Sequence, residues 1–123
     1  MSFDWHKYIT LAEKLVLEQN EANLRSAISR TYYGVFCISR NKKGYKSYTL
    51  KQGENIHWKV INEYKNSEKP NETLVGKYLD ELRRDRNNAD YKEDKNIHKG
   101  LAERAIFKAK QVLEMLGEIY VTN

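Results

Sequence analysis

Cysteine, proline and long apolar runs are all scarce in this chain of 123 residues, and each scarcity excludes a class of protein to which the chain could belong. The lone cysteine, Cys37, excludes an internal disulfide and favours a reducing compartment, so we expect a cytoplasmic protein. One proline, Pro70, and no glycine-rich linker leave no sign of a domain boundary, so residues 1–123 are expected to form one domain. No apolar run approaches the ~20 residues of a membrane-spanning helix, and neither a signal peptide nor membrane association is expected.

Basic residues outnumber acidic residues, 22 to 17, and the surplus is concentrated in one segment. Between positions 40 and 59 the only acidic residue is Glu54, and it is outnumbered by six basic residues: Arg40, Lys42, Lys43, Lys46, Lys51 and Lys59. Because Tyr45 and Tyr48 lie among these lysines, the segment suits single-stranded nucleic acid, with lysines on phosphates and rings on bases. An acidic protein partner is a second interpretation, and a solvated loop without a ligand is a third.

Apolar residues recur every three or four positions along most of the chain, which predicts an all-α bundle. The expected helices cover roughly residues 4–18, 20–44, 56–64, 71–91 and 96–120. Gly44 is expected to end the second helix, and Pro70 places the start of the fourth at Asn71 or Thr73. The last helix would be on the order of 35 Å long. Gly34, inside the second helix, indicates a close approach of another helix.

Arg86 occupies a position where the pattern calls for a core residue. The apolar stripe of the fourth helix runs from Val75 through Leu79 and Leu82 and continues through Arg86 to Ala89. A guanidinium taken out of water is costly unless it is paired. Its partner is expected to be Asp90 one turn later, a partner chain, or a phosphate group.

Two motifs in the chain resemble those of the HEPN domain family. Residues 29–36 read Ser-Arg-Thr-Tyr-Tyr-Gly-Val-Phe, and residues 86–91 read Arg-Asn-Asn-Ala-Asp-Tyr, preceded by Leu82-Arg83. His57 lies between them at the start of the third helix. The resemblance covers most of the chain and implies an up-and-down bundle of four or five antiparallel helices that commonly dimerises.

Many HEPN proteins are metal-independent endoribonucleases of toxin–antitoxin or defence systems, often encoded beside a small nucleotidyltransferase antitoxin. Their motif is an Arg followed, after four to six residues, by a His, and two motifs face each other in the dimer. Here the residues four to seven positions after Arg86 are Asp90, Tyr91, Lys92 and Glu93, without a His. The family role therefore transfers to Arg86 alone, and this chain matches the Ala-Asp-Tyr branch.

Metal-free RNA cleavage needs a base, an acid and a cation, and Arg86, Asp90 and Tyr91 are the candidate catalytic residues. Arg86 suits the cation because its planar fork grips a phosphate through two hydrogen bonds. Asp90 is the candidate base, although an adjacent Arg would lower its pKa and weaken it. Tyr91 is a weak acid or base at neutral pH. The competing interpretation is a structural Arg86–Asp90 ion pair that ends the helix.

Further candidates surround this motif. Those assigned to nucleic-acid binding are Arg30, Arg83, Lys42, Lys43 and Lys46. His57 is either a catalytic residue or a packed residue at the start of its helix. The histidines show no ligand spacing, so no metal and no other cofactor is expected.

The sequence thus predicts a homodimeric prokaryotic HEPN-type domain that binds RNA or a nucleotide and that is a candidate metal-independent endoribonuclease. The alternative is a non-catalytic adaptor that binds a small nucleotidyltransferase. In that case the Arg86–Asp90 end of the helix is structural, or part of the interface.

Overall fold

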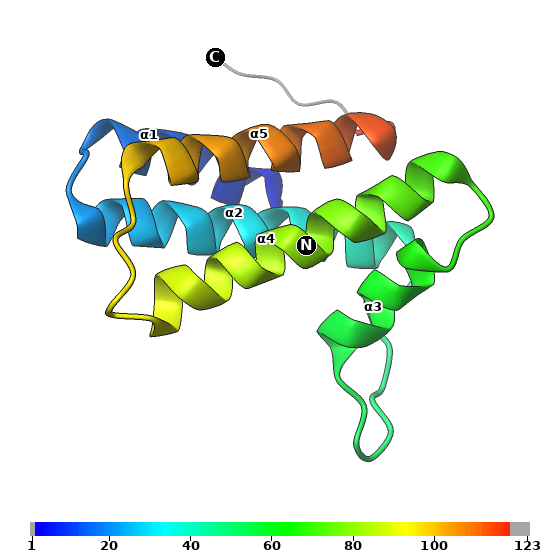
Figure 1. Ribbon diagram of the computed structural model, residues 1–123. Helices are drawn as coiled ribbons and strands as arrows, with labels where there is room; N and C mark the ends of the chain where they lie inside the picture. Colours follow the sequence, from blue (N-terminus) through cyan, green and yellow to red (C-terminus); the bar gives the residue numbers. More distant parts are fainter. Residues whose placement is uncertain (1, 119–123) are drawn as a thin grey trace.

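The computed structural model describes residues 2–118, and the regular structure within that range is entirely helical, as predicted (Figure 1). The five helices are α1 (His6–Leu17), α2 (Glu21–Lys42), α3 (Ile56–Lys65), α4 (Pro70–Tyr91) and α5 (Lys99–Met115). Across residues 2–118, no helix combines the length and the apolar character that crossing a lipid bilayer requires.

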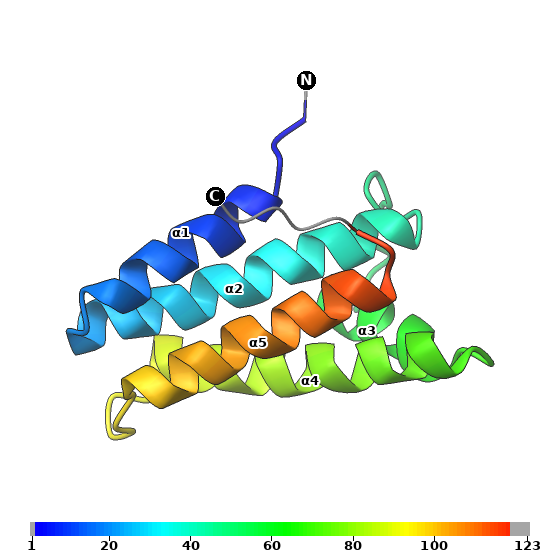
Figure 2. The same cartoon turned by 90° about the horizontal axis from the view of Figure 1, so that it is seen from above.

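Helix α2 is the centre of the bundle, because it contacts each of the other four helices. Helices α1, α2, α4 and α5 lie alongside one another, and the shorter α3 is set at an angle beside α4 (Figures 1 and 2). Apolar residues that recur along α2 at spacings of three and four, from Leu24 to Phe36, are buried, and Tyr32 is fully enclosed. Because α2 and α4 also carry the two sequence motifs, this packing brings the motifs together.

Polar caps and glycines set several of the helix boundaries. The side chain of Asn20 accepts a hydrogen bond from the Asn23 backbone N–H at 2.9 Å and caps the start of α2. At the other end Gly44 has a φ of 85°, and the N–H of Tyr45 reaches back to the Arg40 carbonyl at 3.0 Å. This is the glycine-terminated helix end that the sequence predicted.

Two helices differ in extent from the prediction, α4 at its start and α5 at both ends. Helix α4 begins at Pro70 itself, because the fixed φ of proline suits the first helical position and its missing N–H would have no partner there. Helix α5 runs from Lys99 to Met115 rather than from 96 to 120, so it is about 25 Å long. Gly117, with a φ of 73°, ends it, and Tyr120 lies outside the described residues.

Two glycines allow helices to approach closely. A Cβ atom on Gly34 would lie 3.0 Å from both Ile9 Cδ1 and Tyr8 Cβ, so the predicted close approach is confirmed and the neighbour is α1. A Cβ atom on Gly76 would lie 2.6 Å from the backbone nitrogen of Lys65, where α3 ends against α4. Backbone atoms cannot rotate away as a side chain can, so the contact at Gly76 is the stricter one.

Replacement of Gly76 by alanine is therefore expected to destabilise the protein, because α3 must move away from α4. We expect Gly76→Ala to lose about 1–3 kcal/mol of unfolding free energy in urea titrations, in spite of the higher helix propensity of alanine. The matched control is Gly100→Ala in α5, where the added Cβ meets only the His98 ring at 3.2 Å. Equal stability of the two variants would contradict the close contact.

Candidate functional site

The last turns of α4 place Arg83, Arg86 and Asp90 along one face of the helix, at spacings of three and four residues. Arg86 Nε donates to Asp90 Oδ2 at 2.8 Å, and Arg86 Nη2 donates to the Tyr91 hydroxyl at 3.0 Å. Arg86 Nη1 donates to the side-chain oxygen of Asn87 at 3.1 Å. The Arg86 side chain is only 16% exposed. Of the expected partners for Arg86, Asp90 is therefore the one that the structure contains.

Aromatic rings also contact the Arg86 guanidinium. Its central carbon lies 4.9 Å from the ring centre of Tyr33, on α2, and 5.1 Å from that of Tyr91. Cation–π attraction at these distances stabilises the charge away from bulk water. Tyr91 itself is 68% exposed, so one ring of this arrangement is open to a ligand.

Asp90 links α4 to α2 as well as to Arg86. Its Oδ2 atom accepts a hydrogen bond from the Ser29 hydroxyl at 3.1 Å in addition to the one from Arg86. Ser29 opens the motif of residues 29–36, so the two sequence motifs meet at this carboxylate. With both donors in place, Asp90 is the ion-pair partner of Arg86 and also links α4 to α2.

His57, at the start of α3, completes this side of the bundle. Its ring stacks on Phe36 with centroids 4.4 Å apart, and a hydrogen bond of 2.7 Å joins its Nδ1 atom to the Tyr32 hydroxyl. Burial, together with the guanidinium groups of Arg83 and Arg86, lowers the pKa of His57 to about 4. The imidazole is therefore neutral at pH 7, and of the two predicted alternatives the structure places it in the packed role.

The Tyr32 hydroxyl stays protonated, because burial raises the pKa of Tyr32. A protonated hydroxyl can donate to Nδ1 or accept from it, so this hydrogen bond is compatible with either tautomer of the neutral imidazole. The Nε2 atom of His57 forms no hydrogen bond with another residue in 2–118 and can serve a ligand as a donor or as an acceptor.

We call this group of residues the arginine cluster: Tyr33, His57, Arg83, Arg86, Asp90 and Tyr91. Arg83 forms no hydrogen bond or ion pair with another described residue, and each terminal nitrogen of Arg86 keeps a second N–H. A planar fork with unused N–H groups suits a phosphate oxygen, and an exposed tyrosine ring suits a nucleobase. The cluster can therefore bind an anionic, aromatic ligand.

Arg30 is not brought into the arginine cluster. It points toward α1, where its guanidinium carbon lies 5.1 Å from the Tyr8 ring centre and Nη1 donates to the Tyr8 hydroxyl at 3.3 Å. The Ser-Arg-x-Tyr-Tyr motif therefore divides between two faces of α2, with Arg30 on one and Tyr33 on the other.

The basic loop that follows α2 is also separate from the cluster. Lys42 pairs with Glu118 at 3.1 Å, Lys43 pairs with Glu72 at 2.9 Å, and the Lys46 ammonium donates to the Ser2 hydroxyl. Lys42 is nine residues beyond Tyr33, the member of the arginine cluster on α2, or roughly 14 Å along the helix axis. The three lysines predicted to bind nucleic acid thus have partners within the chain and lie at the other end of α2.

The loop tyrosines are similarly occupied. The Tyr45 hydroxyl donates to Glu63 at 3.0 Å, and the Tyr48 hydroxyl donates to Glu54 at 2.9 Å. The Lys59 ammonium lies over both rings, 5.7 Å and 5.1 Å from their centres. These contacts attach the loop to α3, so its rings are less available for stacking on bases than the sequence indicated.

Sequence reasoning missed Arg25, which fastens the end of α4. Its Nη1 atom donates to the carbonyls of Ala89 at 2.9 Å and Lys92 at 3.2 Å, and Nη2 donates to the Lys95 carbonyl at 2.6 Å. The same side chain pairs with Glu21 at 2.9 Å. A cation at a helix C-terminus also interacts favourably with the helix dipole. Glu21 and Arg25 stand four residues apart in the sequence, a spacing that by itself indicates only an exposed pair.

The described residues contain no group of three or more His, Cys, Asp or Glu side chains that could hold a metal ion. Cys37 is buried among apolar side chains, and burial raises the pKa of its thiol. His6 is paired with Asp4 at 3.0 Å and lies near Glu118 at 3.6 Å.

The low pKa of His57 predicts a pH-dependent loss of stability. Both the folded and unfolded states are neutral at His57 above its ordinary pKa of 6.5, but only the unfolded state takes up the proton as the pH falls toward about 4. We expect up to about 3 kcal/mol of unfolding free energy to be lost across that window. In denaturant titrations across this pH window, the unfolding free energy of His57→Gln should not show this loss. The control His98→Gln, at an exposed position, should show it.

The Arg25 contacts predict that this side chain stabilises the end of α4. We expect Arg25→Met, which keeps an apolar stem, to lose about 2–3 kcal/mol in chemical denaturation. Backbone amides of residues 89–97 should exchange faster with solvent. Arg25→Lys should recover little, because an ammonium cannot reach several carbonyls at once. The exposed Arg104→Met is the control, and unchanged stability of Arg25→Met would refute the role.

Comparisons of this chain with protein-family models, with curated proteins and with solved structures found no match.

Proposed function

We propose that this chain is a HEPN-type domain, with an up-and-down antiparallel bundle, that binds RNA at the arginine cluster. The observation that carries the proposal is the placement of Arg83 and Arg86 beside the neutral His57 and the rings of Tyr33 and Tyr91. Two cations beside one carboxylate leave a positive surplus where an aromatic ring is open to solvent. Phosphate and nucleobase groups together match that chemistry.

Metal-independent cleavage is the second part of the proposal. A phosphate bound by Arg86 would compete with Asp90 for the guanidinium, and the carboxylate released in this way would lie beside the bound group. Asp90 then takes the 2′-hydroxyl proton, Arg86 stabilises the negative charge of the phosphorane, and the Tyr91 hydroxyl donates to the departing oxygen. Each of these three side chains already contacts another in the free protein.

The proposed setting is a prokaryotic toxin–antitoxin or defence system, with the protein acting as a homodimer in the cytoplasm. Pairing of two arginine clusters across a twofold axis would double the positive charge offered to one RNA strand. A small nucleotidyltransferase is the proposed antitoxin partner.

The alternative is a non-catalytic adaptor for that nucleotidyltransferase. It is favoured by one observation: all three guanidinium nitrogens of Arg86 already have hydrogen-bond acceptors within the chain. A side chain satisfied in this way can hold a helix end in place without any ligand. Under this alternative, replacing Arg86 alters stability and partner binding but changes neither RNA binding nor RNA cleavage.

Binding of labelled single-stranded RNA, followed by fluorescence anisotropy, tests the proposal. We expect Arg86→Ala to weaken binding at least about tenfold, as loss of a charge-assisted contact implies, and to reduce the dependence of affinity on salt. The matched control is Arg84→Ala, which removes the same charge from the same helix at a side chain that is 69% exposed. Its affinity should stay within about twofold of the unmodified protein.

Incubation with RNA in EDTA tests cleavage separately. Asp90→Asn should bind RNA at least as well as the unmodified protein, because a competing carboxylate charge is gone, but should not cleave it. Cleavage by the unmodified protein that Asp90→Asn retains would rule out Asp90 as the base. If Arg86→Ala folds and binds RNA as the Arg84→Ala control does, the proposed RNA site is wrong and the adaptor is favoured.

A further inference from the structure

Trp58 is a large aromatic side chain that the fold leaves uncovered. It lies in the first turn of α3 and is 65% exposed. Two hollows adjoin it, one of about 370 Å³ and one of about 330 Å³, and Trp58 and Lys59 line both. Hollows of about 300 Å³ and more are within the range of small-ligand sites.

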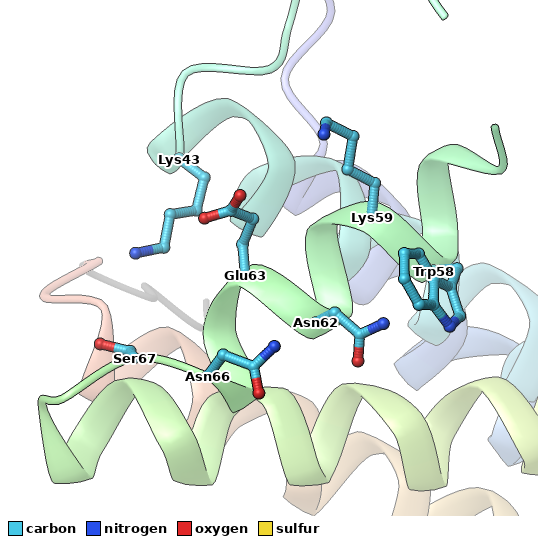
Figure 3. Close-up of a pocket in the computed structure, with 7 residues that line it drawn as sticks. All are labelled: Lys43, Trp58, Lys59, Asn62, Glu63, Asn66 and Ser67. Carbon is cyan, nitrogen blue, oxygen red and sulfur yellow. The ribbon is translucent and has the colours of Figure 1, made fainter. Parts of the chain in front are cut away.

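The larger hollow, shown in Figure 3, is polar apart from the indole ring. Trp58, Asn62 and Asn66 follow one another at intervals of four residues and so share one face of α3 and its C-terminal cap. The side-chain amides of Asn62 and Asn66 form no hydrogen bond with any residue in 2–118. Each amide therefore offers a donor and an acceptor to a ligand.

The charged groups of this hollow already have partners. Lys43 pairs with Glu72 at 2.9 Å, Lys59 lies 3.5 Å from Glu54, and Glu63 accepts a hydrogen bond from Tyr45. Attraction of a free phosphate is correspondingly small. The groups that remain available are one indole face and two amides, which are the groups that stack on a planar base and pair with its polar edge.

We propose that Trp58, Asn62 and Asn66 form a site for an unpaired nucleobase, purine rather than pyrimidine because the larger ring system gives more stacking area. Adenine is the expected base, since an asparagine amide can pair with its N6 and N7 atoms together. Trp58 directly follows His57, so the base site and the arginine cluster both include a residue of the first turn of α3. The inference rests on the proposed RNA binding.

A protein interface is less consistent with this surface. Interface hot spots are aromatic side chains enclosed by other apolar groups. Trp58 is the only apolar side chain among the seven residues that line the larger hollow, and the other six are polar or charged. The surface thus provides one stacking platform without the apolar surround that a docked protein would need.

Fluorescence of Trp58 provides the test. The chain has two tryptophans, so Trp5→Phe leaves Trp58 as the single emitter. We expect AMP and single-stranded oligoadenylate to quench this emission, whereas ribose 5-phosphate and an abasic strand of equal length should not. Trp58→Ala should weaken oligoadenylate binding about tenfold, as loss of one stacked base implies, with Trp58→Phe in between. The matched control is Phe107→Ala on α5, a side chain that is 62% exposed.

The outcomes separate this inference from the proposed function. RNA binding that depends on Arg86, without quenching of Trp58 and without an effect of Trp58→Ala, overturns the base site and leaves RNA binding intact. Quenching by AMP in a protein that does not bind RNA supports the base site and refutes the RNA function. If neither AMP nor oligoadenylate quenches the emission, the base site is wrong and a protein contact is the remaining use for Trp58.

Discussion

The ion pair between Arg86 and Asp90 is the interaction on which this end of the molecule depends. The Arg86 side chain is 16% exposed, so its guanidinium has lost most of its hydration. The Asp90 carboxylate at 2.8 Å and the rings of Tyr33 and Tyr91 compensate for this loss. Because Asp90 also accepts from Ser29 on α2, the pair fixes the position of α4 relative to the central helix. Removing either partner would leave the other as an unpaired, partly buried charge.

Arg25 joins the same two helices as Arg86, but it projects from α2 toward α4. Arg25 projects from α2 and binds the carbonyls that α4 leaves unpaired where it ends, together with those of the following connector. Arg86 projects from α4 and is tied through Asp90 to α2. The two helices are therefore joined by reciprocal polar contacts at one end, while apolar packing joins them along their length. This arrangement gives the arginine cluster a rigid base.

Interactions between residues close in sequence were predictable, and those between distant residues were not. The five helices, the stop at Gly44 and the Arg86–Asp90 pair all follow from spacings of a few residues. The contacts of Arg25 span more than sixty residues, and no periodicity reveals them. The contact between His57 and Tyr32 is also between residues distant in sequence, so no periodicity reveals it. The ion pairs of the loop lysines were not predictable either, because composition shows charge but not the carboxylates that fold against it.

The internal carboxylate also determines how the cluster can meet a ligand. In the free protein Asp90 occupies the Nε atom of Arg86, so a phosphate that used Nε together with a terminal nitrogen would have to displace the carboxylate. In that arrangement the internal pair would reduce the affinity for a ligand, which favours an extended polyanion, with contacts at several points, over a single phosphate ion. Under the proposed function, a carboxylate displaced from Arg86 would lie beside the bound group, so the step assigned to Asp90 would depend on a substrate being present.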